Sequence, residues 1–178
     1  TAGQTYGTAA FNPTVDSLYD AASAETATID ISGVSGASAA ESGTQQVSIS
    51  ITESNSAPTV TLTTNDSSLS ESDSDATLTA TLSLATYQNV TVTLDTSGTA
   101  TEGTDYADIS TITVSAGSTT GTTAFNPTDD SHYDAASAES ATVYISGVSG
   151  GAATESGTQT LAIAITDNEN APTVSLSS

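Results

Sequence analysis

The stretch "AFNPTDDSHYDAASAESATVYISGVSG", from Ala124 to Gly150, decides how the rest of the chain is interpreted. It repeats "AFNPTVDSLYDAASAETATIDISGVSG", from Ala10 to Gly36, 114 positions further along the chain. The match continues without a gap, so that Thr1–Thr64 aligns with Ser115–Ser178 and 41 of the 64 positions are identical. Self-similarity at one long, fixed period is typical of tandem domain-sized units.

The register of the repeat divides the chain into three parts. We expect residues 1–57 to be the C-terminal part of one unit, residues 58–170 to be a complete unit, and residues 171–178 to be the first strand of the next. Such a chain is either a window from a longer repetitive protein or a subunit whose incomplete units are completed by neighbours.

Apolar and hydroxyl side chains alternate along short runs of the complete unit, and a period of two is typical of half-buried β-strands. The runs are Thr59–Leu62, Ala76–Ala85, Asn89–Leu94, Asp108–Val114, Thr120–Phe125, Ala141–Ser146 and Thr160–Thr166. The segments between them are rich in Gly, Ser, Asp and Asn, and no stretch has a helical period. About seven short strands per unit predict an all-β protein of tandem Ig-like antiparallel β-sandwich repeats.

Pairs of aromatic and glycine residues recur at matching repeat positions. We interpret the aromatic pairs as core or loop anchors and the glycine pairs as parts of a turn. The pairs are Phe11 with Phe125, Tyr19 with Tyr133, Gly33 with Gly147, and Gly36 with Gly150.

The chain has a formal net charge of −21 and contains neither Lys nor Arg. Without a basic patch, nucleic acid and anionic membrane surfaces are poor partners, and we expect no membrane insertion. Without Cys there is no disulfide and no thiolate metal site. Met and Trp are also absent, and trypsin-like proteases find no cleavage site. The cysteine count does not indicate a compartment, but the lack of oxidisable Met and Trp and of trypsin cleavage sites favours an extracellular or cell-surface location.

The acidic residues are distributed unevenly among the loops. If successive strands are antiparallel, every odd-numbered connection lies at the same end of the sandwich. Those connections and the exit from the last strand hold 14 of the 15 carboxylates of the unit, and Glu155 is the exception. The 14 residues are Asp66, Glu71, Asp73, Asp75, Asp95, Glu102, Asp105, Asp108, Asp129, Asp130, Asp134, Glu139, Asp167 and Glu169.

Carboxylates gathered at one end repel each other, by roughly 4 kcal/mol for two charges 4 Å apart at an effective dielectric constant near 20. Because the chain has no Lys or Arg to offset this repulsion, we expect a bound cation to do so. Oxygen ligands from several loops suit Ca²⁺, which takes about 6–8 of them in flexible geometry. The alternative is a set of solvated acidic loops, because Asp and Asn favour turns.

The acidic loops resemble those of the Calx-beta family. The segment "TVTVTLDTSGTATEGTDYADIS" is similar to that family's strand followed by a TA-x-x-G-x-DY turn. "NPTDDSHYDAASAESATVYISG" resembles its paired-Asp loop, and "ITDNENAPTVSL" resembles its acidic exit into the next unit. Together these segments cover most of the complete unit.

The resemblance implies a seven-stranded sandwich that binds Ca²⁺ at its distal loops. Matched residue by residue, it implies the ligands Glu71, Asp105, Asp129, Asp130 and Asp167, with Asp134, Glu139 and Glu169 as further candidates. Asp134 stands where the family usually has Glu, and the exit "DNEN" is not wholly acidic.

The partial unit departs further from the family pattern. Val15 replaces the first Asp of the paired-Asp loop, Glu53 replaces Asp167, and Asn55 replaces Glu169. We therefore predict weaker metal binding there than in the complete unit.

His132 is the only histidine and lies between Asp130 and Asp134. A catalytic triad would also need a Ser nucleophile and an oxyanion hole. The first repeat has Leu18 at this position, so the repeat does not require an imidazole. We interpret His132 as a solvated loop residue and expect no enzymatic activity.

The sequence therefore predicts a calcium-binding structural repeat of a secreted or cell-surface bacterial adhesin or matrix protein, in which Ca²⁺ stiffens the junctions between repeats. Its expected partners are neighbouring repeats or copies of itself, with a cell-surface or matrix partner also possible. One alternative is a subunit of an extracellular filament assembled by strand complementation. Another is an accessory binding module of a secreted enzyme.

Overall fold

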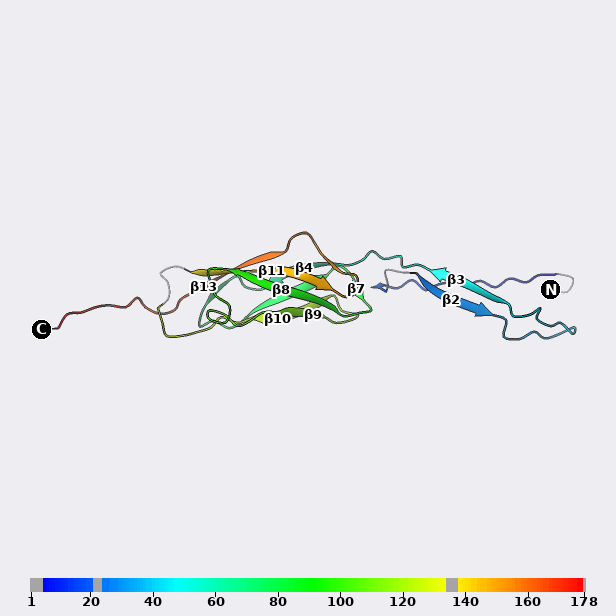
Figure 1. The fold of residues 1–178 in the computed structure, drawn as a ribbon, viewed down its shortest axis with the longest axis horizontal. Helices are drawn as coiled ribbons and strands as arrows, with labels where there is room; N and C mark the ends of the chain where they lie inside the picture. The colour runs from blue at the N-terminus through cyan, green and yellow to red at the C-terminus, as the bar shows by residue number, and fades with distance from the viewer. Residues whose placement is uncertain (1–4, 21–23, 134–137, 178) are drawn as a thin grey trace.

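Two β-sheets packed face to face form the complete unit in the computed structural model, which describes residues 5–20, 24–133 and 138–177 (Figure 1). One sheet has the strand order β10 (Thr120–Phe125), β6 (Ala76–Leu82), β4 (Thr59–Thr64) and β12 (Thr154–Glu155). The other has the order β5 (Ser68–Ser70), β13 (Thr160–Thr166), β11 (Glu139–Ser149), β8 (Val90–Gly98) and β9 (Thr111–Val114). The pairing is antiparallel except where β12 joins β4 and β5 joins β13. The prediction of an all-β sandwich is confirmed.

The alternating pattern places one face of each strand in the core. In β6, for example, Ala76, Leu78, Ala80 and Leu82 are buried, whereas the threonines between them are more exposed. Complete burial of one Val, Leu or Ile side chain contributes about 1.5–3 kcal/mol. Burial of such residues from both sheets therefore holds the sandwich together.

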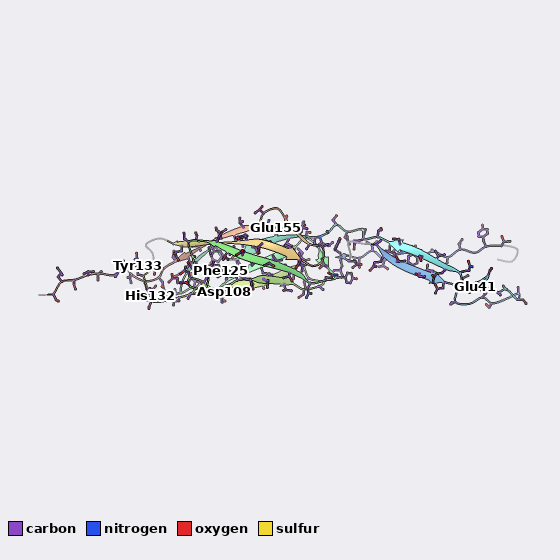
Figure 2. All side chains as sticks on the ribbon, viewed as in Figure 1. Glu41, Asp108, Phe125, His132, Tyr133 and Glu155 are labelled. Carbon is purple, nitrogen blue, oxygen red and sulfur yellow. The ribbon has the colours of Figure 1, made fainter. Side chains whose placement is uncertain are left out.

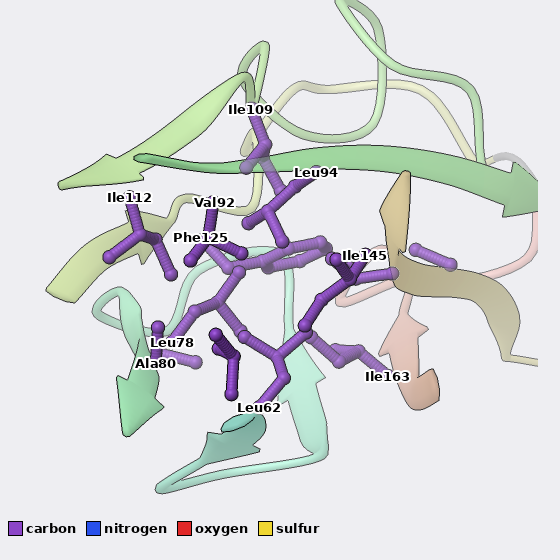
Figure 3. Packing of buried hydrophobic residues seen from close by; sticks show 14 of the residues in the cluster. Leu62, Leu78, Ala80, Val92, Leu94, Ile109, Ile112, Phe125, Ile145 and Ile163 are labelled. Carbon is purple, nitrogen blue, oxygen red and sulfur yellow. The ribbon is translucent and has the colours of Figure 1, made fainter. Parts of the chain in front are cut away.

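The aromatic centre of the core lies between the sheets (Figure 3). Phe125, at the end of β10, is fully buried, and its ring stacks on that of Tyr106 with 4.8 Å between the centroids. Tyr106 follows the acidic turn after β8, and it bridges to Pro127. The stacked pair therefore anchors two distal loops to the core, as the sequence predicted for Phe125.

The strand limits agree with the predicted runs most closely where the alternation is uninterrupted. β10 and β13 have the predicted bounds, whereas β8 and β11 extend beyond theirs. The run expected over Ala76–Ala85 is divided into β6 and the short β7 (Ala85–Thr86). The strands β5 and β12 lie outside every predicted run, because two or three residues are too few to show a period.

The partial unit contributes a hairpin of β2 (Glu25–Asp30) and β3 (Gln46–Ile51), which correspond in the repeat to β11 and β13. Before it, β1 (Leu18–Tyr19) pairs in parallel with β7 of the complete unit. The hairpin leaves apolar side chains such as Ile29 and Val47 exposed. The division of the chain at residues 57 and 170 stays a prediction. Among the described residues, no helix could span a membrane.

Gly36 and Gly150 both have the positive φ that a tight turn requires, at 95° and 89°. Gly150 follows β11, and its counterpart Gly36 lies in the connection between β2 and β3. The conformation is strained for residues with a Cβ, which explains why glycine recurs here. The turn predicted for this pair is confirmed, whereas the turn predicted at Gly147 is wrong, because Gly147 lies within β11 next to a shift in its register with β8.

Candidate metal centre

The acidic loops meet at the end of the sandwich from which β13 leaves, here called the distal end. The backbone N–H of Glu71, after β5, donates to the carbonyl of Thr166 at the end of β13 (3.1 Å). The N–H of Thr128 donates to the carbonyl of Asp105 (2.9 Å), which joins the loops after β8 and β10. Glu155 lies away from this end, whereas His132 and Tyr133 lie on it (Figure 2).

Three carboxylates converge at the distal end. Glu71, Asp167 and Glu169 each offer an oxygen atom within 4.8 Å of the others. Glu71 is 6% exposed, and the other two are half-buried. Asp167 directly follows β13, so the sheet fixes the direction in which this arm of the cluster leaves the sandwich.

Glu169 is tied to Asp167, and its carboxylate has one buried oxygen without a hydrogen-bond partner. Its backbone N–H donates to Asp167 Oδ1 (2.7 Å), which folds the exit segment back toward β13. Its Oε2 atom is buried and has no hydrogen-bond partner. Burial raises the pKa of this carboxyl, and the hydrogen bond and negative charge of Asp167 raise it further. A buried oxygen without a donor, in an all-oxygen cluster, fits a hard cation such as Ca²⁺.

Asp129 and Asp130 of the paired-Asp loop lie close to this cluster but, among the described residues, are not part of it. The side-chain amide of Asn168 donates to Asp129 Oδ1 (3.2 Å). The charges of Asp129 and Asp130 also contribute to the raised pKa of Glu169. Both aspartates are exposed, so they are placed to supply outer ligands or to attract a cation.

The remaining predicted ligands are used or placed differently. Asp105 Oδ2 accepts the N–H of Thr101 (2.5 Å) and thereby closes the acidic turn. Glu139 lies at the start of β11, opposite Ile165. Asp134 lies outside the described residues. Asp95, which the sequence assigned to a distal loop, lies instead within β8 opposite Tyr144. The predicted ligand set as a whole stays a prediction.

His132 lies on the surface, with a side chain that is 79% exposed. The backbone N–H of His132 donates to Asp130 Oδ1 (2.6 Å). The solvated loop position expected from the sequence is therefore the one observed.

The partial unit has its own acidic cavity, of about 250 Å³, lined in part by Asp16, Asp20, Glu25, Glu53 and Asn55. Burial raises the pKa of Asp20, as do the charges of Asp16, Glu53 and Glu25. The backbone N–H groups of Asn55 and Asp20 hold the pKa of Glu53 below its usual value. Glu53 therefore receives hydrogen bonds, whereas Asp20 Oδ1 is buried without a partner. Weaker metal binding in this unit stays a prediction.

Two solved structures have folds similar to this one. The apo form of the Calx CBD1 domain aligns with a TM-score of 0.50 and 15% identity, over 62% of this chain and 98% of that one. CBD12 from CALX1.2 aligns with the same TM-score and identity. That alignment covers 62% of this chain but only 44% of CBD12. No family model and no curated protein matches the chain. At this identity the likeness shows the fold alone, which is Calx-beta-like.

Proposed function

We propose that this chain is a Ca²⁺-binding structural repeat of a secreted or cell-surface protein of the adhesin or matrix type. The observation that carries the proposal is the convergence of Glu71, Asp167 and Glu169, with the Glu169 Oε2 atom buried and without a donor. The family resemblance of the loops supports it, because that resemblance implies Ca²⁺ ligands at the distal end, and the Calx-beta-like fold agrees with the resemblance. The absence of the easily oxidised Met and Trp, and of the Lys and Arg at which trypsin-like proteases cut, supports the extracellular setting.

Charge neutralisation would be the mechanism. Bound Ca²⁺ would compensate the carboxylates of the loop after β5 and of the exit after β13. Because the exit leads into the segment that starts the next unit, the same ion would restrict the angle between neighbouring units. The residues of the chain supply the oxygen ligands and the ion supplies the opposite charge that the sequence lacks.

Thermal unfolding of the full chain in EDTA, in millimolar Ca²⁺ and in millimolar Mg²⁺ tests the proposal. Binding only to the folded state adds about 2.7 kcal/mol of stability at 100 times the dissociation constant. We therefore expect Ca²⁺ to raise the Tm by several degrees and Mg²⁺ to raise it little. Equal midpoints in EDTA and Ca²⁺ would contradict the proposal and leave solvated acidic loops as the explanation.

Glu169→Gln separates site binding from a general charge effect. This variant should lose most of the Ca²⁺-dependent rise in Tm. The matched control is Glu155→Gln, which removes one charge away from the distal end and keeps an oxygen that can accept the N–H of Gln159 (2.6 Å). A similar loss of the Ca²⁺ response in both variants would indicate diffuse attraction rather than a site.

A filament subunit is the second candidate, and one observation favours it. The segment Thr173–Ser178 repeats β4, in which Val60 and Leu62 are buried. The corresponding Val174 and Leu176 are 95% and 100% exposed. Pairing of this segment with another copy would cover them. Assembly of the full chain that disappears on Val174→Asp would support this candidate, and a concentration-independent monomer would contradict it.

A further inference from the structure

The junction between the two units is built by a short parallel strand pair. Leu18 and Tyr19 of β1 lie opposite Ala85 and Thr86 of β7. The N–H of Tyr87 donates to the carbonyl of Tyr19 (3.3 Å), and Tyr19 itself is only 8% exposed. The contact joins the distal end of the partial unit to the opposite, proximal end of the complete unit (Figure 1).

Side chains on both sides reinforce this backbone pairing. The hydroxyl of Tyr87 donates to Asp16 Oδ2 (3.3 Å). The side-chain amide of Asn55 donates to the carbonyl of Leu18 (3.0 Å). The loop of the first unit that corresponds to the paired-Asp loop therefore connects it to the second unit. The repeat comparison could not reveal this role, because the position of Tyr87 occurs only once in the chain.

The matching loop of the complete unit lies at its distal end and shares one backbone hydrogen bond with the loop of the partial unit, although His132–Tyr133 are not paired as a strand in this structure. The N–H of Leu18 donates to Asp16 Oδ1 (2.9 Å), and the N–H of His132, at the matching repeat position, donates to Asp130 Oδ1 (2.6 Å). Each Asp therefore fixes the backbone that precedes the tyrosine. Tyr133 nevertheless is 37% exposed, whereas Tyr19 is 8% exposed.

The receiving end is shaped by fixed turns rather than by a specific side-chain pocket. Thr86 is 1% exposed, and its carbonyl accepts the N–H of Gly117 (2.8 Å). Gly151, with a φ of 54°, lies so close that a Cβ there would approach Thr86 Cγ2 to 2.8 Å. The strand β7 is thus held in place by both neighbouring turns and presents its remaining backbone edge to a partner.

We propose that His132–Tyr133 is a docking strand for the proximal end of another unit of this type. It would pair in parallel with the Ala85–Thr86 edge of that unit and bury Tyr133, as Leu18–Tyr19 does within this chain. The inference rests on the repeat-array part of the proposed function, but not on metal binding. One hydrogen bond differs between the two junctions. Asn55 donates to the carbonyl of Leu18, whereas Glu169, at the matching position, has no side-chain N–H to donate.

Cysteine cross-linking tests the docking strand, since the natural chain has no Cys. The test protein is the full chain extended after Ser178 by a second copy of residues 65–178, which continues the repeat in register. His132→Cys is combined with Ala85→Cys in the added copy. Directly paired strand residues satisfy the Cα separation of about 4.4–6.8 Å that a disulfide needs.

Two controls calibrate the rate of cross-linking. Leu18→Cys with Ala85→Cys in the 178-residue chain reports the junction already observed. Thr122→Cys, exposed on β10, with Ala85→Cys in the added copy reports unguided collision. Docking should make the His132 pair oxidise about 10²-fold faster than the Thr122 pair, because only docking holds the two thiols at a separation and orientation suited to a disulfide.

Each outcome decides the inference. A His132 pair that oxidises at the rate of the Leu18 pair supports docking, whereas one no faster than the Thr122 pair overturns it. Failure of the Leu18 pair to form would also overturn it, because the template junction would then be wrong. The reaction is repeated in EDTA, where fast cross-linking would show that docking does not need Ca²⁺. If the Tm is also independent of Ca²⁺, only the proposed calcium function is contradicted and the docking strand is not.

Discussion

At the scale of single residues, Tyr87 joins the two units by hydrogen bonds, and carboxylates of the partial unit raise the pKa of its phenol. The charge of Asp16 is the largest influence that raises the pKa of its phenol above 10.0, followed by that of Asp20 and by burial. The folded state therefore holds the Tyr87 proton more tightly than the unfolded chain does. This contribution to stability is complete below pH 10 and is lost as the pH rises from about 10 through the raised pKa.

We predict that Asp16→Asn lowers the pKa of Tyr87. Spectrophotometric titration of tyrosinate, with Tyr87→Phe subtracted to isolate this phenol, measures the shift. The subtraction matters because the pKa values of Tyr106 and Tyr144 are also raised. An unchanged Tyr87 titration in Asp16→Asn would show that the hydroxyl does not face this carboxylate in solution.

The two repeat copies of one phenylalanine provide a second prediction. Phe125 is fully buried and stacked on Tyr106, whereas Phe11 is 40% exposed. Phe125→Ala should cost about 3–5 kcal/mol of unfolding free energy, the range for a buried aromatic side chain. Phe11→Ala should cost about 1 kcal/mol or less, because most surface substitutions have small effects. Urea denaturation of both variants checks this, and equal costs would contradict the different burial.

At the scale of strands and turns, Gly36 and Gly150 make a matched pair. Both have a positive φ, but only at Gly150 would a Cβ collide with backbone, at 2.1 Å from the carbonyl oxygen of Asn89. Gly36→Ala should cost about 1–2 kcal/mol for the left-handed conformation alone. Gly150→Ala should cost about 1–3 kcal/mol more because of overpacking. Thermal unfolding distinguishes the variants, and identical losses would mean that the turn adjusts freely.

The sequence predicted the larger strands because alternation over six or more residues reflects burial on one face of a sheet. β10 and β13 are found at their predicted limits for this reason. The short strands β5 and β7 depend instead on what lies beside them, namely β13 and β1. Such pairing is a tertiary property and leaves no periodic signal in two or three residues.

The candidate site shows the same division between local and tertiary information. Loop parity placed Glu71, Asp167 and Glu169 at one end, and the structure brings their oxygens within 4.8 Å. Parity could not show that Asp105 accepts a backbone N–H from Thr101. The predicted strand ended at Leu94 and so left Asp95 in a loop. In the structure β8 continues to Gly98 through polar residues, which do not alternate with apolar ones. The number of ligands at a metal site therefore depends on contacts that a loop assignment does not contain.

At the scale of the whole molecule, the formal net charge is −21, because the chain has 21 acidic residues and no Lys or Arg to offset them. The carboxylates repel one another, and folding brings these charges closer together. Salt should therefore stabilise the fold by screening, since the Debye length falls from about 10 Å at 0.1 M to about 3 Å at 1 M.

We predict that NaCl raises the Tm over this range at pH 7 and has much less effect near the sequence pI of about 4.1, where much of the negative charge is neutralised. Calorimetry at both pH values measures the response. Adding millimolar Ca²⁺ to 1 M NaCl hardly changes the ionic strength, so any further rise in Tm reports specific binding. Glu169→Gln should keep the NaCl response and lose the additional Ca²⁺ response. A chain indifferent to NaCl at pH 7 would show that its carboxylates do not repel appreciably, and relief of repulsion could then not be how a cation stabilises it.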